Sequence, residues 1–151
     1  MEIIIPKKES PVKTDTGITY NPLVKITPGC KLSVLRTELN EKFTRIDFIY
    51  QATSYYINGG WVRIHDTCFI RPVGSDLKLR MIKAVNIPIA PKRHWFKTSK
   101  DMLCYTLYFP PLPAGTKTID IIEMETNDPS FFNFYGVSVE RIKTEVINVG
   151  N

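Results

Sequence analysis

Short runs of alternating apolar and polar residues constrain the fold of this chain more than any other feature. In one run, Ile46, Phe48 and Tyr50 occupy every second position, and Arg45 and Asp47 lie between them. Successive side chains of an extended strand point to opposite faces, so this pattern predicts a strand with one buried face. The same alternation recurs along most of the chain, which indicates an all-β protein.

The breaks between these runs have the chemistry of turns. The segment 40–42 (NEK) predicts a short hairpin loop, and 58–60 (NGG) and 74–76 (GSD) are turn clusters. The proline-rich segment 110–115 cannot lie in a central strand, so it predicts a stiff crossover between two strands. The predicted strands are 18–26, 30–39, 43–53, 61–65, 67–71, 77–86, 102–109, 117–124 and 133–142.

Eight or nine short strands with such turns favour an immunoglobulin-like antiparallel β-sandwich, and a closed barrel is the alternative. Only 36–42 and 126–132 hint at helix, and both are short. The 151 residues suit one domain. We expect a polar, flexible N-terminal arm over 1–16, the sandwich over 17–143 and a tail over 144–151.

Composition excludes several classes of protein. Apolar residues make up 43% of the chain and charged residues 23%, which is typical of a globular domain rather than a disordered chain. No apolar run has the length of a membrane span, and the run Ile3–Ile5 is too short for the core of a signal peptide. The chain is therefore expected to be either cytoplasmic or the trimmed form of an exported protein.

Candidate catalytic groups do not form a convincing set. His65 and Cys68 lack a glycine-rich loop for an oxyanion, and Asp120 and Glu123 are three residues apart in a predicted strand, on opposite faces. We interpret the two acids as surface residues of a sandwich strand.

The spacing of Cys30, Cys68 and Cys104 does not fit a zinc site, and we expect three buried thiols, with one disulfide as the alternative. The sequence predicts no enzyme, no cofactor and no metal site.

Charge is segregated along the chain. Residues 77–100 carry seven bases and no acid, whereas 119–140 carry five acids and no base. Two interpretations are open. The segments are neighbouring strands whose outer faces pair across the sheet, or they form separate surfaces of opposite sign that suit contacts with copies or partners.

Two loops combine aromatic residues with polar or basic ones, and they are the candidate partner-binding residues. The first contains Lys92, Arg93, His94, Trp95, Phe96 and Lys97; the second contains Tyr55, Tyr56 and Trp61. Arg, Trp and Tyr are enriched at the energetic centres of interfaces. The alternatives are that Trp95 or Phe96 caps the open end of the sandwich, that the first loop binds a polyanion, and that Trp61 belongs to the core.

A further pattern lies in the second half of the chain. The stretch 105–113 (YTLYFPPLP) is followed by 119–123 (IDIIE) and then by 134–137 (FYGV). This resembles a pattern of Bacteroidetes proteins in which "F-x-P-L-P" leads to "I-D-F-I-E" and an aromatic-x-Gly-Ile strand. The likeness covers roughly 20–142. It implies an immunoglobulin-like sandwich of a kind found alone or in front of thioredoxin-like domains, and it implies no catalytic residue.

We therefore expect a non-catalytic binding or structural module that acts through protein–protein contacts, with another protein or copies of itself as partner. The alternative is a subunit of a repetitive assembly, such as an envelope appendage or a phage-like particle. A glycan-active enzyme or glycan-binding module is the third hypothesis. Binding to nucleic acid is not favoured, because the net charge of +5 is moderate.

Overall fold

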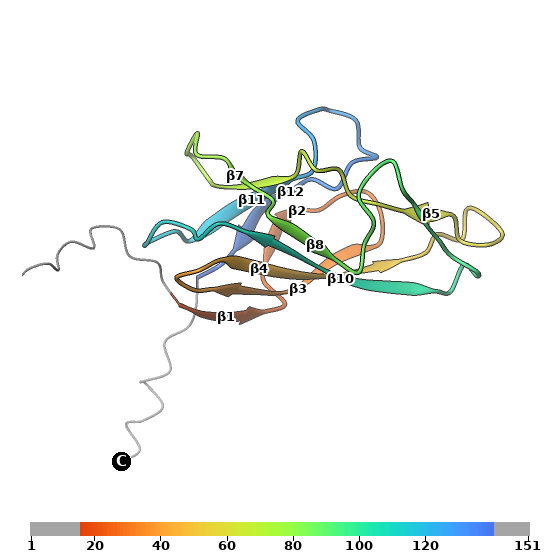
Figure 1. Cartoon of the computed structure of the whole chain (residues 1–151), viewed down its shortest axis with the longest axis horizontal. Helices are drawn as coiled ribbons and strands as arrows, with labels where there is room; N and C mark the ends of the chain where they lie inside the picture. Colours follow the sequence, from red (N-terminus) through yellow and green to blue (C-terminus); the bar gives the residue numbers. More distant parts are fainter. Residues whose placement is uncertain (1–15, 141–151) are drawn as a thin grey trace, which may run out of the picture.

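In a computed structural model, which describes residues 16–140, two antiparallel β-sheets pack face to face (Figure 1). The first sheet contains, in spatial order, β1 (Gly17–Tyr20), β3 (Leu32–Leu39), β4 (Thr44–Gln51), β10 (Met102–Phe109) and β8 (Lys83–Val85). The second contains β2 (Val24–Ile26), β12 (Phe134–Ser138), β11 (Thr118–Ile122), β6 (Phe69–Pro72) and β7 (Leu79–Arg80). A small third sheet pairs β5 (Trp61–Val62) with β9 (His94–Trp95). The predicted all-β antiparallel sandwich is confirmed.

The alternation in the sequence determines which side chains of the central strands enter the core. On β4, Ile46, Phe48 and Tyr50 are buried, and Arg45 and Asp47 face outward. The residues predicted to point inward from the neighbouring β10 are buried as well: Leu103, Tyr105, Leu107 and Phe109. The two strands pair in one continuous antiparallel register.

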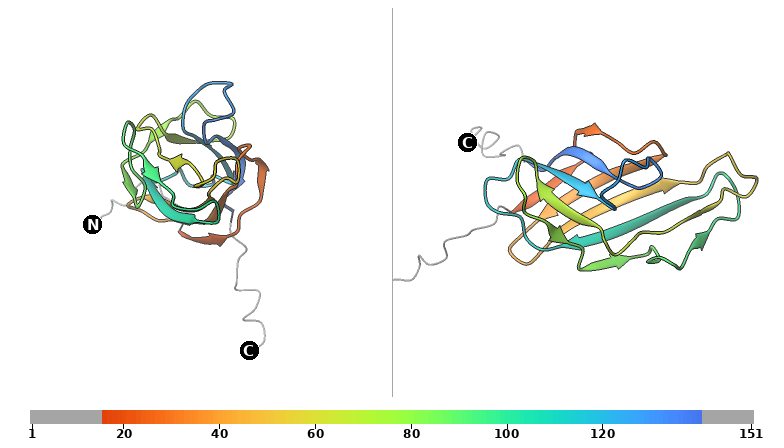
Figure 2. Two further views of the ribbon diagram at one scale, coloured as in Figure 1. Left: turned by 90° about the vertical axis from the view of Figure 1, so that its right-hand side faces the viewer. Right: turned by 90° about the horizontal axis from the view of Figure 1, so that it is seen from above.

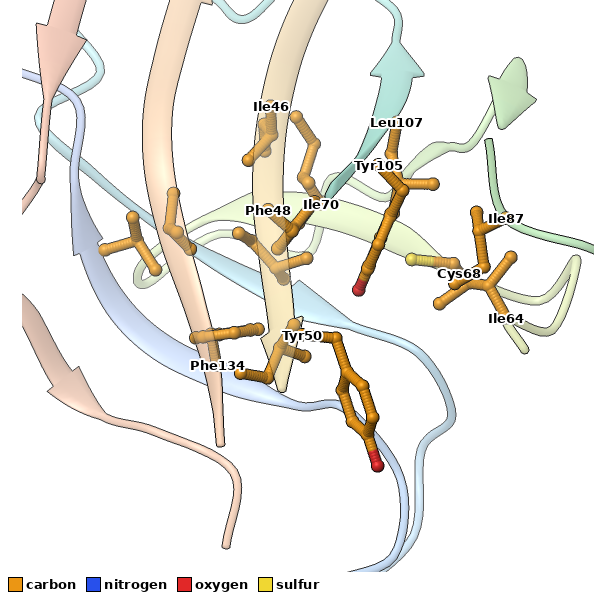
Figure 3. Packing of buried hydrophobic residues seen from close by; sticks show 14 of the residues in the cluster. Ile46, Phe48, Tyr50, Ile64, Cys68, Ile70, Ile87, Tyr105, Leu107 and Phe134 are labelled. Carbon is orange, nitrogen blue, oxygen red and sulfur yellow. The ribbon is translucent and has the colours of Figure 1, made fainter. Parts of the chain in front are cut away.

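Aromatic rings join the two sheets at the centre of the core. The ring of Phe48 stacks on that of Tyr105 with 4.9 Å between centroids, and it meets Phe134 of β12 at 5.8 Å. Figure 3 shows these side chains in one cluster with Ile46 from the first sheet and Ile70 from the second. Removing this apolar surface from water is the main force that holds the sheets together.

Two of the predicted strands, 18–26 and 77–86, each divide into two strands that lie in different sheets. At the first switch, Asn21 has a left-handed φ of 47°, and the following Pro22 has no N–H to continue a ladder. The four strands concerned, β1, β2, β7 and β8, are the edges of the two sheets. The segments between β1 and β2 and between β7 and β8 therefore connect the two sheets covalently at both edges of the sandwich.

The second switch inverts the alternation predicted for its strand. Met81 N donates to a carbonyl beside β6 (2.9 Å), whereas Ile82 N donates to a carbonyl of β10 (2.7 Å). Leu79 packs on the core before the switch and Ala84 packs on it after the switch. Strict alternation would put Val85 on the same face as Leu79, but Val85 is 39% exposed, because a change of sheet reverses which residues point inward.

The predicted turns and crossover are confirmed. Asn40 closes the β3–β4 hairpin by accepting from the N–H groups of Lys42 (2.8 Å) and Phe43 (2.9 Å). The segment 110–115 carries the chain from β10 in the first sheet to β11 in the second. The described residues contain no helix, and hence none that could span a membrane. The predicted arm, apart from Thr16, and the predicted tail lie outside the described residues.

The two ends of the sandwich differ. The loops around β5 and β9 extend one end, at the right in Figure 1 and in the right-hand view of Figure 2. The described chain starts and finishes at the other end, where Thr16 leads into β1 and Glu140 follows β12.

Candidate functional site

The two candidate loops meet in space, although more than 30 residues separate them in the sequence. The pairing of β5 with β9 places Trp61 opposite Trp95, and Phe96 N donates to Gly60 O (3.0 Å). The ring centroids of the two tryptophans are 6.4 Å apart. The sequence predicted both loops but not this pairing, because neither two-residue strand has a period that can be recognised.

A glycine allows the loops to approach closely. Gly59 has φ +86°, and a Cβ atom at this position would lie 2.5 Å from Thr98 O and 2.8 Å from Ala52 Cβ. Both contacts are shorter than a side chain tolerates, so the contact between the loops requires glycine here.

The candidate residues fall into an exposed set and a buried one. Tyr55 (83% exposed), Tyr56 (55%) and Trp95 (57%) reach solvent, and Trp61 is half-buried. The basic candidates are also exposed: Lys92, Arg93, His94 and Lys97. Phe96 is only 4% exposed and stacks on Tyr50 at 5.8 Å between centroids. Phe96 therefore belongs to the core, where it caps the end of the sandwich. It is not available as a partner-binding residue, so this part of the prediction was wrong.

Two guanidinium groups surround the indole of Trp61. The Cζ atom of Arg93 lies 4.3 Å from its ring centroid and that of Arg63 lies 4.8 Å from it. Such cation–π contacts hold the guanidinium groups in place without neutralising them. We call the surface formed by Tyr55, Tyr56, Trp61, Arg63, Arg93 and Trp95 the aromatic end.

A groove of about 700 Å³ adjoins the aromatic end. Tyr56, Trp61 and Arg63 of the aromatic end line it, and so does the segment 128–132. This volume falls within the range of ligand-binding sites in proteins, and its lining of aromatic and few polar groups is typical of them. Its remaining lining residues are Gly29, Cys30, Tyr50, Thr53, Gly60, Val62, His65 and Glu123.

A buried carboxylate holds the floor of the groove. Glu123, 3% exposed, accepts from His65 N (3.0 Å) and His65 Nδ1 (2.9 Å) through Oε2, and from Phe132 N (2.8 Å) through Oε1. Asp120 is also buried and pairs with Arg71 Nε at 3.0 Å. Our interpretation of the two acids as surface residues was wrong, because each finds enough donors to compensate for its loss of water.

His65 and Glu123 have the arrangement of an oriented base. With Nδ1 directed at the carboxylate, Nε2 is the remaining ring nitrogen. Among residues 16–140, no hydroxyl or thiol makes a hydrogen bond to it. The pair can bind a ligand or position the groove wall.

The cysteines differ from the expectation of three buried thiols. Cys68 is buried, whereas Cys30 and Cys104 are exposed, and all three are free. Partial burial of the thiol nevertheless raises the pKa of Cys30 to about 11, so it is protonated at neutral pH. No group of three His, Cys, Asp or Glu side chains in the described part of the chain could hold a metal ion.

The segregated charges largely do not neutralise each other. Within 16–140, one ion pair joins the basic and acidic segments, Lys78 Nζ to Glu125 Oε1 at 2.8 Å. Strand β7 is also separated from β11 by β6, so the two segments are not adjacent strands on that side. Arg93 of the aromatic end belongs to the basic segment and makes no ion pair within this range.

Comparisons with known proteins add no relative: no family model, no curated protein and no solved structure matches this chain.

Proposed function

We propose that this protein is a non-catalytic binding module that captures another protein with its aromatic end. The observation that carries the proposal is the pairing of β5 with β9, which gathers exposed Trp95, half-buried Trp61 and Arg93, a cation with no ion pair among residues 16–140, beside one groove. Trp, Tyr and Arg dominate the binding energy of protein interfaces, where rigid aromatic anchors lose little conformational entropy. The resemblance to immunoglobulin-like Bacteroidetes modules is part of this proposal.

The chemistry of the groove supports binding more than catalysis. The Cys30 thiol has a raised pKa and is a poor nucleophile at neutral pH, and Cys68 lies in the core. His65 has an orienting carboxylate but no hydroxyl or thiol partner among residues 16–140. A groove with aromatic walls and few charged groups suits recognition.

Site-specific photo-crosslinking tests the proposal. A photoreactive phenylalanine is placed at position 95 and, as a matched control, at Ile82, which is 62% exposed between β7 and β8. In extracts of the native cells, we expect position 95 to give a discrete adduct with another protein, and Arg93→Ala to reduce it. Identical adducts at both positions, or none at position 95, would refute capture by the aromatic end.

A second surface favours the alternative of a repetitive assembly. Tyr20, Leu23 (82% exposed) and Ile26 (55%) present an apolar strip along the β1–β2 edge, away from the aromatic end. Two different contact surfaces on one chain are what a head-to-tail assembly requires. The mass from light scattering should then rise with concentration and fall back in Leu23→Glu; a strict monomer at all concentrations contradicts this alternative.

A further inference from the structure

The guanidinium group of Arg63 is only partly satisfied by the described residues. Its Nε is buried and has no hydrogen-bond partner among the described residues, and its Nη1 makes one long bond of 3.3 Å to Pro91 O. Arg36, Arg45 and Arg71, in contrast, all pair with aspartates. Nε is out of contact with solvent, so a ligand in the groove would bind the terminal nitrogens of Arg63, of which Nη2 has no acceptor among residues 16–140.

A second unpaired cation lies next to it. Arg93 makes no ion pair with the described part of the chain, and it contacts the same indole as Arg63. Both guanidinium groups are held by Trp61, so little side-chain entropy remains to be lost when an anion binds. Guanidinium groups in fixed positions are suited to carboxylates, which accept two parallel hydrogen bonds.

The surroundings of the two arginines favour a peptide over other anions. The guanidinium groups lie within cation–π distance of the indole of Trp61, where a sugar ring or a base would otherwise stack. Asp128 also lines the groove, so a polyanion with several charges would bring one of them near a carboxylate. A peptide with a single carboxylate avoids this, and its apolar side chains can contact Tyr56 and Phe131.

We propose that the groove beside the aromatic end binds an acidic peptide segment of the partner, in which a carboxylate is held by Arg63 and attracted by Arg93 outside the groove, and flanking apolar side chains contact the aromatic residues of the groove. This inference rests on the proposed function and names the chemistry of its partner.

Selection from a library of random twelve-residue peptides on the whole protein tests the inference. We expect the enriched peptides to share an Asp or Glu next to an aromatic or aliphatic residue. Arg63→Met keeps the apolar stem and should weaken binding of the strongest peptide by about tenfold or more, since it removes a desolvated charge pair. Arg93→Met should weaken it less. Arg80→Met, the same change at an exposed arginine of β7 outside the groove, should leave the affinity unchanged.

Cysteine alkylation locates the bound peptide. Cys30 lines the groove and Cys104 is exposed on β10, away from it. A saturating peptide should slow alkylation of Cys30 and leave that of Cys104 unchanged. Protection of neither thiol would place the peptide elsewhere and overturn the inference.

The remaining outcomes separate this inference from the proposed function. Enriched peptides without an acidic residue, or an Asp→Asn peptide that binds equally well, would refute recognition of a carboxylate. Capture of a partner by the aromatic end would still stand. If the selection enriches no peptide but position 95 still crosslinks to a partner, the claim that the groove binds a linear peptide is refuted, and the proposed function is not. If the peptide selection is empty and position 95 crosslinks to no protein, both the binding of an acidic peptide and the capture of a partner by the aromatic end are refuted.

Discussion

Replacement of Glu123 by glutamine tests whether the buried carboxylate builds the groove. Its two oxygens receive three hydrogen bonds, two from His65 and one from Phe132, and they join the end of β11 to two segments that line the groove. Glutamine keeps the size of the side chain but has one acceptor oxygen instead of two. If this oxygen faces His65, the amide NH₂ faces the N–H of Phe132, and two donors oppose each other.

The cost follows from the bonds that are lost. A hydrogen bond to a charged group contributes about 1.5–3 kcal/mol, and a donor left without a partner adds a desolvation penalty. We therefore expect Glu123→Gln to lower the free energy of unfolding by about 2–4 kcal/mol. Glu125→Gln is the matched control, because its ion pair with Lys78 is 2.8 Å long but half-exposed. Loss of an exposed pair costs less than about 1 kcal/mol.

Urea denaturation followed by tryptophan fluorescence measures both variants. Limited proteolysis with chymotrypsin reports on the groove wall, where Phe131 and Phe132 should be cleaved faster in Glu123→Gln than in Glu125→Gln. Equal stability of the two variants, or a large loss in Glu125→Gln alone, would show that the carboxylate of Glu123 does not hold the wall and would refute the reasoning.

Three other predictions concern single side chains. Phe96→Ala should destabilise the fold by about 3–5 kcal/mol, whereas Trp95→Ala should change the free energy of unfolding by less than about 1 kcal/mol; equal thermal shifts would contradict the division into core and surface. Partial burial would raise the pKa of Asp47, but hydrogen bonds from neighbouring hydroxyl and guanidinium groups outweigh it and hold the pKa below 3.8. Asp47 thus stabilises the fold above about pH 4 and loses this effect as the pH falls through its lowered pKa, so Asp47→Asn should flatten the acid side of a stability–pH curve. At pH 8 the raised pKa of Cys30 lowers the fraction of its thiol in the thiolate form about 100-fold, and the greater nucleophilicity of that thiolate offsets part of this loss. Alkylation of Cys30 should therefore be about tenfold slower than that of an ordinary thiol of pKa 9. Mass spectrometry measures the rate at each cysteine, and an ordinary rate at Cys30 would contradict the prediction.

The sequence predicts the centre of the sandwich well and its edges poorly. Strands β3, β4 and β10 are eight residues long, and their alternation is read over several periods. The strands 18–26 and 77–86 appear continuous in sequence, because a change of sheet alters hydrogen-bond partners and not residue type. Only Asn21 and Pro22 give a local signal for a switch, and Met81 and Ile82 give none.

The candidate site was predicted in part. Composition alone identifies the exposed aromatic and basic residues, whereas burial separates Phe96 from its neighbour Trp95. Arg63 was missed, although it lies two residues after Trp61 in an extended run and thus on the same face. Glu123 was predicted at the surface but is buried. An acid at the end of an apolar strand can be buried only where other segments supply hydrogen-bond donors, and here these come from His65 and Phe132, which the local sequence does not indicate.

Closure along both edges has a mechanical consequence. The segments that join β1 to β2 and β7 to β8 tie each sheet to the other on both sides, so neither sheet can slide or peel away without strain on a covalent connection. The two sheets should therefore open as one cooperative unit. In native-state hydrogen exchange, the slowest amides of β4 and β11 would then share a single opening free energy, equal to that of global unfolding.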